Sequence, residues 1–238
     1  MGSSVSKVRD ELKAQQAAEK AQIEQRLDIL EKMVHGRLDK EQEDILQGRR
    51  GNQEIQTGTI VEMHRQINIT DSTKQDLDKC LTDSIGDFFK GDFLGGFQQL
   101  VKVGADTVLG NASVGEYETT DMFIIWNSNA LIRCDTYYYR WNFTSSGVIN
   151  DSDGCAGVLL VKRIIDATKV DPQVLTWAIT NQVMRNMEME SENPSPEEIE
   201  KRAAEVIDSA MKILEKVVEF QVKVKLMEDG KSSDSSSP

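Results

Sequence analysis

The clearest pattern of hydrophobic positions lies in the last fifth of the chain. Apolar residues there recur at alternating spacings of four and three, which places them along one stripe of an α-helix. The stripe consists of Ile199, Ala203, Val206, Ala210, Ile213, Val217, Phe220 and Val224. Ser195-Pro196-Glu197-Glu198 precedes it and matches a capping box with proline at the first helical position. We therefore predict a C-terminal heptad helix over 191–229.

Such a seam is typical of a coiled coil, because every apolar position can contact a partner helix. We expect the protein to be a homo-oligomer that assembles through this helix. The residues expected to carry the association are Ile199, Val206, Ile213, Val217, Phe220 and Val224.

Residues 5–46 form a second long helical pattern. Its apolar positions fall in a narrow arc at 100° per residue. They are Val5, Ile23, Leu27, Leu30, Val34, Leu38 and Ile45. A narrow stripe on an otherwise polar helix favours packing against a partner helix rather than in a deep core. Gly48 and Gly51 then mark a break.

The centre of the chain has weaker signals. Two amphipathic helices are expected over 72–90 and 97–109, and a third begins at Pro172. Residues 122–126 favour a strand, whereas the aromatic-rich segment 130–143 fits a strand or a helix equally well. The apolar segment Val158 to Ile165 is expected to be buried.

These patterns predict a mainly α protein. Long N- and C-terminal amphipathic helices would flank a compact centre with a small β element around 120–145. The expected divisions are an N-terminal helical arm at 1–50, a compact central domain at 51–190, the C-terminal heptad helix at 191–229 and a disordered, serine-rich tail at 230–238.

The charge and the cysteine content limit the expected partners and the expected cellular compartment. The net charge is −12, and Arg49-Arg50 is the only pair of adjacent arginines, so the clustered cations that bind a phosphate backbone are missing and no nucleic-acid partner is expected. The first residues lack the apolar core of a signal peptide, and no apolar run is long enough to span a membrane. Three cysteines without paired spacing suit a reducing compartment. We expect a cytoplasmic location.

No motif indicates catalysis. His35 and His64 lack neighbouring ligands at metal-site spacing. The segment 150–154 resembles the start of a calcium loop, but Leu160 stands where the terminal glutamate belongs, so a tight turn is the simpler interpretation. A row of carboxylates on the 72–90 helix is typical of a solvated face; it comprises Asp76, Asp83 and Asp87. We expect no catalytic, cofactor-binding or metal-binding residues.

The first six residues carry one specific signal. Met1-Gly2-Ser3-Ser4-Val5-Ser6 matches the N-myristoylation pattern completely. In a eukaryotic cell Gly2 would then be the lipidation site, and the protein a lipoprotein associated with a membrane surface. One myristoyl chain binds membranes only marginally, with a constant on the order of 10⁴ M⁻¹, so stable attachment would need several chains in one oligomer.

Together these features favour a non-enzymatic, self-associating structural or scaffold protein, with a membrane tether at Gly2. The alternative is a membrane-active helical protein of toxin or effector type, in which an apolar hairpin inserts into the bilayer. The residues of that hairpin would be Phe88, Phe89, Phe93, Leu94 and Phe97. The third hypothesis is an enzyme without a recognisable motif.

Overall fold

The computed structural model describes most of the chain in seven long elements. The described residues are 3–50, 54–70, 85, 88, 103–105, 107–108, 115–126, 130–144, 152–190 and 194–233. The elements are α1 (Ser3–Leu46), β1 (Thr57–Thr70), β2 (Gly115–Trp126), β3 (Leu131–Thr144), β4 (Ser152–Ile165), α4 (Pro172–Glu190) and α5 (Pro196–Ser233). Most of the helices expected over 72–90 and 97–109 lies outside the described residues.

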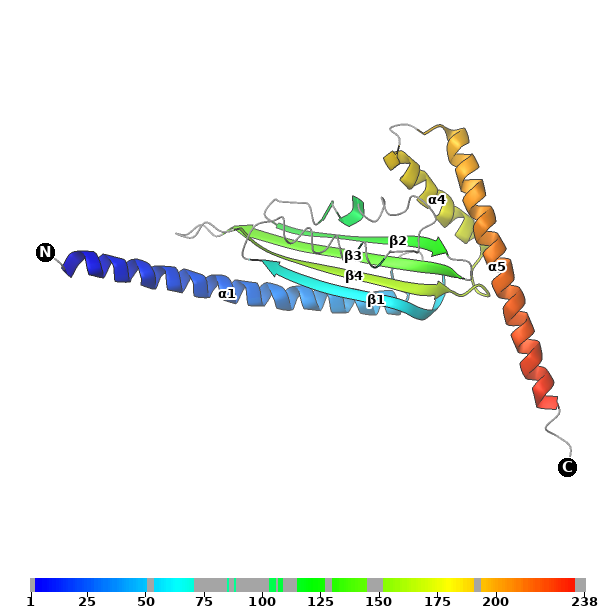
Figure 1. Cartoon of the computed structure of the whole chain (residues 1–238), viewed down its shortest axis with the longest axis horizontal. Coiled ribbons are helices and arrows are strands. Elements are labelled where there is room, and N and C mark those ends of the chain that lie inside the picture. Colours follow the sequence, from blue (N-terminus) through cyan, green and yellow to red (C-terminus); the bar gives the residue numbers. More distant parts are fainter. Residues whose placement is uncertain are drawn as a thin grey trace, which may run out of the picture.

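A four-stranded antiparallel sheet forms the centre of the molecule, with strand order β1-β4-β3-β2 (Figure 1). The expectation of a mainly α protein is therefore wrong. Strands β3 and β4 are buried on both faces, so apolar and aromatic residues occur at odd and even positions alike, without the alternation that identifies a half-exposed strand. The segment 130–143, which fitted strand or helix equally well, is strand β3, and the expected strand at 122–126 is the end of β2.

Strand β1 had no counterpart in the sequence interpretation, although its sequence contains a signal. Val61, Met63, Ile67 and Ile69 alternate with polar residues, as expected for a strand with one apolar face. Arg65 interrupts the alternation, and this obscures the period. Strand β4 also begins earlier than expected, at Ser152, within the segment interpreted as a turn.

Helix α1 lies along one face of the sheet (Figure 1). Its buried side chains Leu30, Val34, Leu38 and Ile45 pack in one cluster with side chains of β3 and β4. The strand residues of this cluster are Tyr137, Tyr139, Cys155, Leu159 and Val161. From Leu30 onward, the narrow apolar stripe of the N-terminal helix thus meets a sheet, rather than the partner helix that was expected.

The opposite face of the sheet carries the larger core. Helices α4 and α5 pack against each other and against the end of the sheet, with Leu175, Ile179 and Val183 of α4 buried in this cluster. Ile85, Phe88, Ala105 and Val108 belong to the same cluster. The capping box at the start of α5 forms as predicted: the Ser195 hydroxyl accepts a hydrogen bond from the Glu198 amide, and the Glu198 carboxylate accepts one from the Ser195 amide.

Helix α4 also closes part of an edge of the sheet. The Gln182 side-chain oxygen accepts a hydrogen bond of 2.7 Å from the Ile124 amide, and the Gln182 side-chain nitrogen donates one of 2.9 Å to the Ile124 carbonyl. Strand β2 is the outer strand on this side, so these backbone groups point away from the neighbouring strand. The side-chain amide of Gln182 therefore makes the two hydrogen bonds with Ile124 that a residue of an additional strand would make.

Both long helices extend beyond the sheet (Figure 1). The N-terminal part of α1 projects past one end of the sheet, and the C-terminal part of α5 runs away from the other end. Helix α5 continues to Ser233, into the segment 230–238 that was expected to be disordered. Among the described residues, none of the helices is both long and apolar enough to cross a membrane.

Gly157 of β4 allows α1 to approach the sheet closely. A Cβ atom added at this position would lie 2.7 Å from Val34 Cγ1 and 3.1 Å from a Leu38 methyl group. We expect Gly157→Ala to lower the free energy of unfolding by about 1–3 kcal/mol, because stiff, buried side chains would have to move. Urea denaturation measures this change.

The control for this prediction is Gly36→Ala on α1. Nothing lies within 4 Å of a Cβ added at Gly36, so alanine should stabilise the helix by about 0.5–1 kcal/mol. Equal effects of the two substitutions would contradict the described contact between α1 and the sheet.

Candidate functional site

The predicted association residues of α5 do not share one environment. Ile213 is buried within the subunit, and Val206 and Val217 are partly buried against the same core. Ile199 is half-buried. Phe220, in contrast, is 68% exposed, and Val224 is also exposed. The stripe is continuous in the sequence but divided in the structure. The body of the same subunit covers its first part, and its second part is exposed.

The second part leaves a patch of large apolar side chains on a projecting helix. We call Phe220 and Val224, which continue the stripe, the distal surface of α5. Val222 and Leu226 are exposed as well, but they face another side of the helix, because residues two positions apart do not share a helix face. Isolated apolar residues are normal on protein surfaces, but several together mark a contact site.

Other residues singled out from the sequence are not brought together. His35 is exposed on α1, where its Nδ1 lies 2.9 Å from a guanidinium nitrogen of Arg65. His64 is half-buried on β1, near the ring of Phe88. Within the described part of the chain, no group of three or more His, Cys, Asp and Glu side chains could hold a metal ion. Gly2, Asp76, Asp83 and Asp87 lie outside the described residues.

A buried cluster of charges on β3 and β4 had no signal in the sequence interpretation. Arg133 and Arg163 are direct partners across the two strands, and both are buried. Like charges in this arrangement repel each other. Asp135 lies between them and accepts hydrogen bonds from both, at 2.8 Å from Arg133 Nη2 and 2.8 Å from Arg163 Nη2. One carboxylate thus makes the arginine pair stable.

Arg133 also holds the chain that connects α1 to β1. Its guanidinium donates a hydrogen bond of 3.1 Å to the Ile55 carbonyl and another to the Arg50 carbonyl. A buried guanidinium needs several acceptors, and here two of them are backbone groups of this connection. The cluster therefore fixes the position of the C-terminal end of α1.

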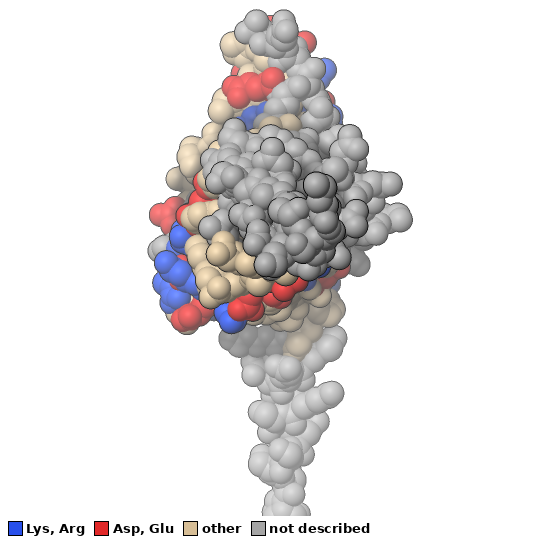
Figure 2. Space-filling view, turned by 90° about the vertical axis from the view of Figure 1, so that its left-hand side faces the viewer, with Lys and Arg blue, Asp and Glu red and all other residues tan. Residues whose placement is uncertain are grey.

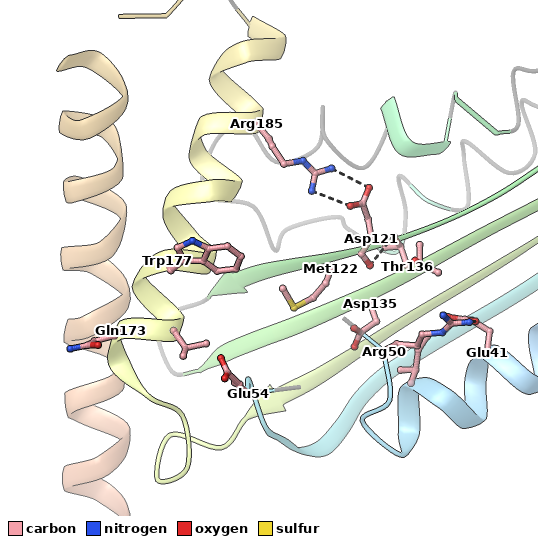
Figure 3. Close-up of a pocket in the computed structure, with 13 residues that line it drawn as sticks. Glu41, Arg50, Glu54, Asp121, Met122, Asp135, Thr136, Gln173, Trp177 and Arg185 are labelled. Atoms are coloured by element: carbon pink, nitrogen blue, oxygen red, sulfur yellow. Dashed lines mark hydrogen bonds and ion pairs between the residues drawn. The ribbon is translucent and has the colours of Figure 1, made fainter. Parts of the chain in front are cut away.

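A groove of about 800 Å³ lies next to this end of α1, between α1, β2 and α4 (Figure 3). Residues from 41–54 form one wall, and residues of α4 form the other. Met122 and Thr120 of β2 lie between them. Figure 3 shows Trp177 at the α4 side and Glu41 with Arg50 at the α1 side. No spacing in the sequence indicated this site, because its residues come from four distant segments: α1 with the connection after it, β2, β3 and α4.

Ion pairs line both sides of the groove. Arg185 of α4 donates two hydrogen bonds to Asp121, at 3.0 and 3.3 Å. Arg50 donates one of 2.6 Å to Glu41 Oε2. Burial raises the pKa of Glu41, and its pairing with Arg50 opposes this shift.

The described surface seen along α1 carries both signs of charge. Figure 2 shows basic and acidic side chains intermixed over this face. In the comparisons with known proteins, no family model matches the chain, and no curated protein matches it.

The buried cluster gives a stability prediction. We expect Arg133→Met to lower the free energy of unfolding by about 3–5 kcal/mol, because one member of a buried charged group is lost. The matched control is Arg185→Met. Its side chain is 43% exposed, so loss of its pair with Asp121 should cost about 1 kcal/mol or less. Thermal or urea unfolding measures both; similar losses would show that Arg133 does not anchor the fold.

Proposed function

We propose that the protein is a non-enzymatic structural subunit that associates with copies of itself through the distal surface of α5. The observation that supports this is the change from buried to exposed side chains along one continuous apolar stripe. The body of the subunit covers Ala210 and Ile213, and the same helix face continues to Phe220 and Val224 without cover from the described residues. The α5 helix of a second copy has the same spacing of apolar residues, so it could cover them.

The regular spacing supports a second copy as the partner. Val217, Phe220 and Val224 continue the alternation of three and four, so two identical helices can interdigitate along this stripe. Glu219 and Lys223 are exposed on the neighbouring polar face and form a favourable i,i+4 charge pattern. The projecting position of this part of α5 gives a second helix access to it (Figure 1).

The energies are of the right order for reversible assembly. Complete burial of a Phe or Val side chain contributes up to about 3 kcal/mol. A symmetric pair would bury Phe220 and Val224 twice, or roughly 12 kcal/mol at most. Association costs about 4–15 kcal/mol in lost freedom of motion. The interface therefore depends on nearly all of the distal surface.

The membrane-inserting alternative has less support. It requires Phe88 at the start of an apolar hairpin that is free to enter a bilayer. Phe88 is buried in the larger core, with Lys162 Nζ 4.2 Å from the centre of its ring. Releasing it would break this packing.

Myristoylation of Gly2 would add a membrane tether to this proposal. The N-terminal part of α1 projects beyond the sheet (Figure 1), so an acyl group near Ser3 would be separated from the body. Several subunits joined through α5 would present several acyl chains at once, and avidity would then strengthen a weak individual interaction.

Two matched double variants test the association. We expect Phe220→Gln with Val224→Gln to abolish self-association, because the distal surface loses its two stripe residues without a change in charge. Glu219→Gln with Lys223→Gln alters the same helical turns and also keeps the net charge, and it should leave association unchanged. Sedimentation equilibrium or native mass spectrometry gives the mass of each assembly. A monomeric wild-type protein, or equal effects of both variants, would contradict the proposal.

Lipidation has its own test. Co-expression with an N-myristoyltransferase should increase the intact mass by one myristoyl group and cause the protein to sediment with liposomes. Gly2→Ala should abolish both effects, because acylation requires an N-terminal glycine. Lys7→Gln is the control and should retain the modification. An unmodified wild-type protein under these conditions would end the tether proposal and leave association through α5 unaffected.

A further inference from the structure

The groove between α1, β2 and α4 combines an apolar surface with an unsatisfied polar atom. Its apolar part consists of Ile45, Met122, Val174 and Trp177. Trp177 is 63% exposed, which is high for the largest aromatic side chain. Its indole ring stands at the α4 side of the groove (Figure 3). A flat or elongated apolar group could cover this ring and the side chains next to it.

The polar atom is an oxygen of Glu41. Glu41 lines the groove, although its exposed fraction is only 3%. Its Oε2 accepts the hydrogen bond from Arg50, whereas Oε1 is buried and has no hydrogen-bond partner among the described residues. A buried acceptor without a donor is unfavourable. A ligand with N–H groups would supply the missing donor.

The charges around the groove disfavour an anion beside Glu41. Asp135 is paired with Arg133 and Arg163, Asp121 with Arg185, and Glu41 with Arg50 through Oε2. An anion at Glu41 Oε1 would place one acceptor against another and a negative charge beside a carboxylate. A positive ligand with N–H groups meets neither penalty.

We propose that this groove binds a small organic ammonium ligand with an aromatic or alkyl body. The ammonium group would donate a hydrogen bond to Glu41 Oε1, and the body would lie across Met122 towards Trp177. This site is separate from the distal surface of α5 and does not depend on self-association.

Three probes that differ only in their polar group test the ligand class. They are 2-phenylethylammonium, 2-phenylethanol and 3-phenylpropanoate, each titrated into the full-length protein by calorimetry. We expect the ammonium probe to bind about tenfold more tightly than the alcohol, because it makes a charge-assisted hydrogen bond. The carboxylate should bind most weakly. Equal binding of ammonium and alcohol, tighter binding of the carboxylate, or no binding of any probe would overturn the proposal.

Variants then assign the two ends of the site. Trp177→Ala should weaken the ammonium and alcohol probes by a similar factor, because the body of the probe loses its contact. The control is Val61→Ala, which removes an exposed apolar side chain of β1 outside the groove lining and should change neither affinity. A loss in both variants would overturn the assignment of Trp177.

Glu41→Gln should abolish the preference for ammonium over alcohol, with a loss of about tenfold in ammonium affinity. An unchanged preference in the folded variant would overturn the assignment of Glu41. Circular dichroism establishes whether this buried substitution is tolerated. If it is not, Arg50→Gln provides the second test: it removes the cation that competes for Glu41, so the preference for ammonium should increase. A reduced preference in this variant would overturn the assignment.

Discussion

The contact of Asp135 with two arginines is the interaction on which the other parts of the molecule depend. Arg133 and Arg163 face each other on adjacent strands in the interior, an arrangement that is stable only with a carboxylate between them. Arg133 then extends to the carbonyl groups of Arg50 and Ile55. The same guanidinium therefore joins the middle of the sheet to the connection after α1. The end of α1 forms a wall of the groove, so the site depends on this buried cluster as well.

The sheet is covered on both faces, and this explains both its stability and the error in the predicted fold class. Helix α1 covers one face, and the larger core covers the other. A strand in such a position has apolar or aromatic residues at odd and even positions alike, as Tyr137, Tyr138 and Tyr139 illustrate. The period of two disappears, and sequence patterns alone then favour strand and helix equally. The helical ends of the chain, in contrast, keep one solvent-exposed side and show their period clearly.

The sequence could predict the stripe of α5 but not the groove, because only the stripe is local in the sequence. The stripe of α5 is local, so its residues could be listed from spacing alone. The point at which the subunit stops covering it, between Val217 and Phe220, depends on where α4 and the sheet end, and no local pattern contains that information. The groove is non-local throughout. Glu41, Met122 and Trp177 are far apart in sequence, and each has an ordinary local environment.

The hydrogen bonds between Gln182 and Ile124 bear on how copies of this protein can grow into larger structures. An outer strand with free amide and carbonyl groups can accept a strand from another chain, which leads to continuous sheets and fibres. At Ile124 both groups are already bonded to a side chain that packs within its own subunit. An incoming strand would have to displace this amide and disturb α4. Growth by strand addition is thus opposed at this position of β2.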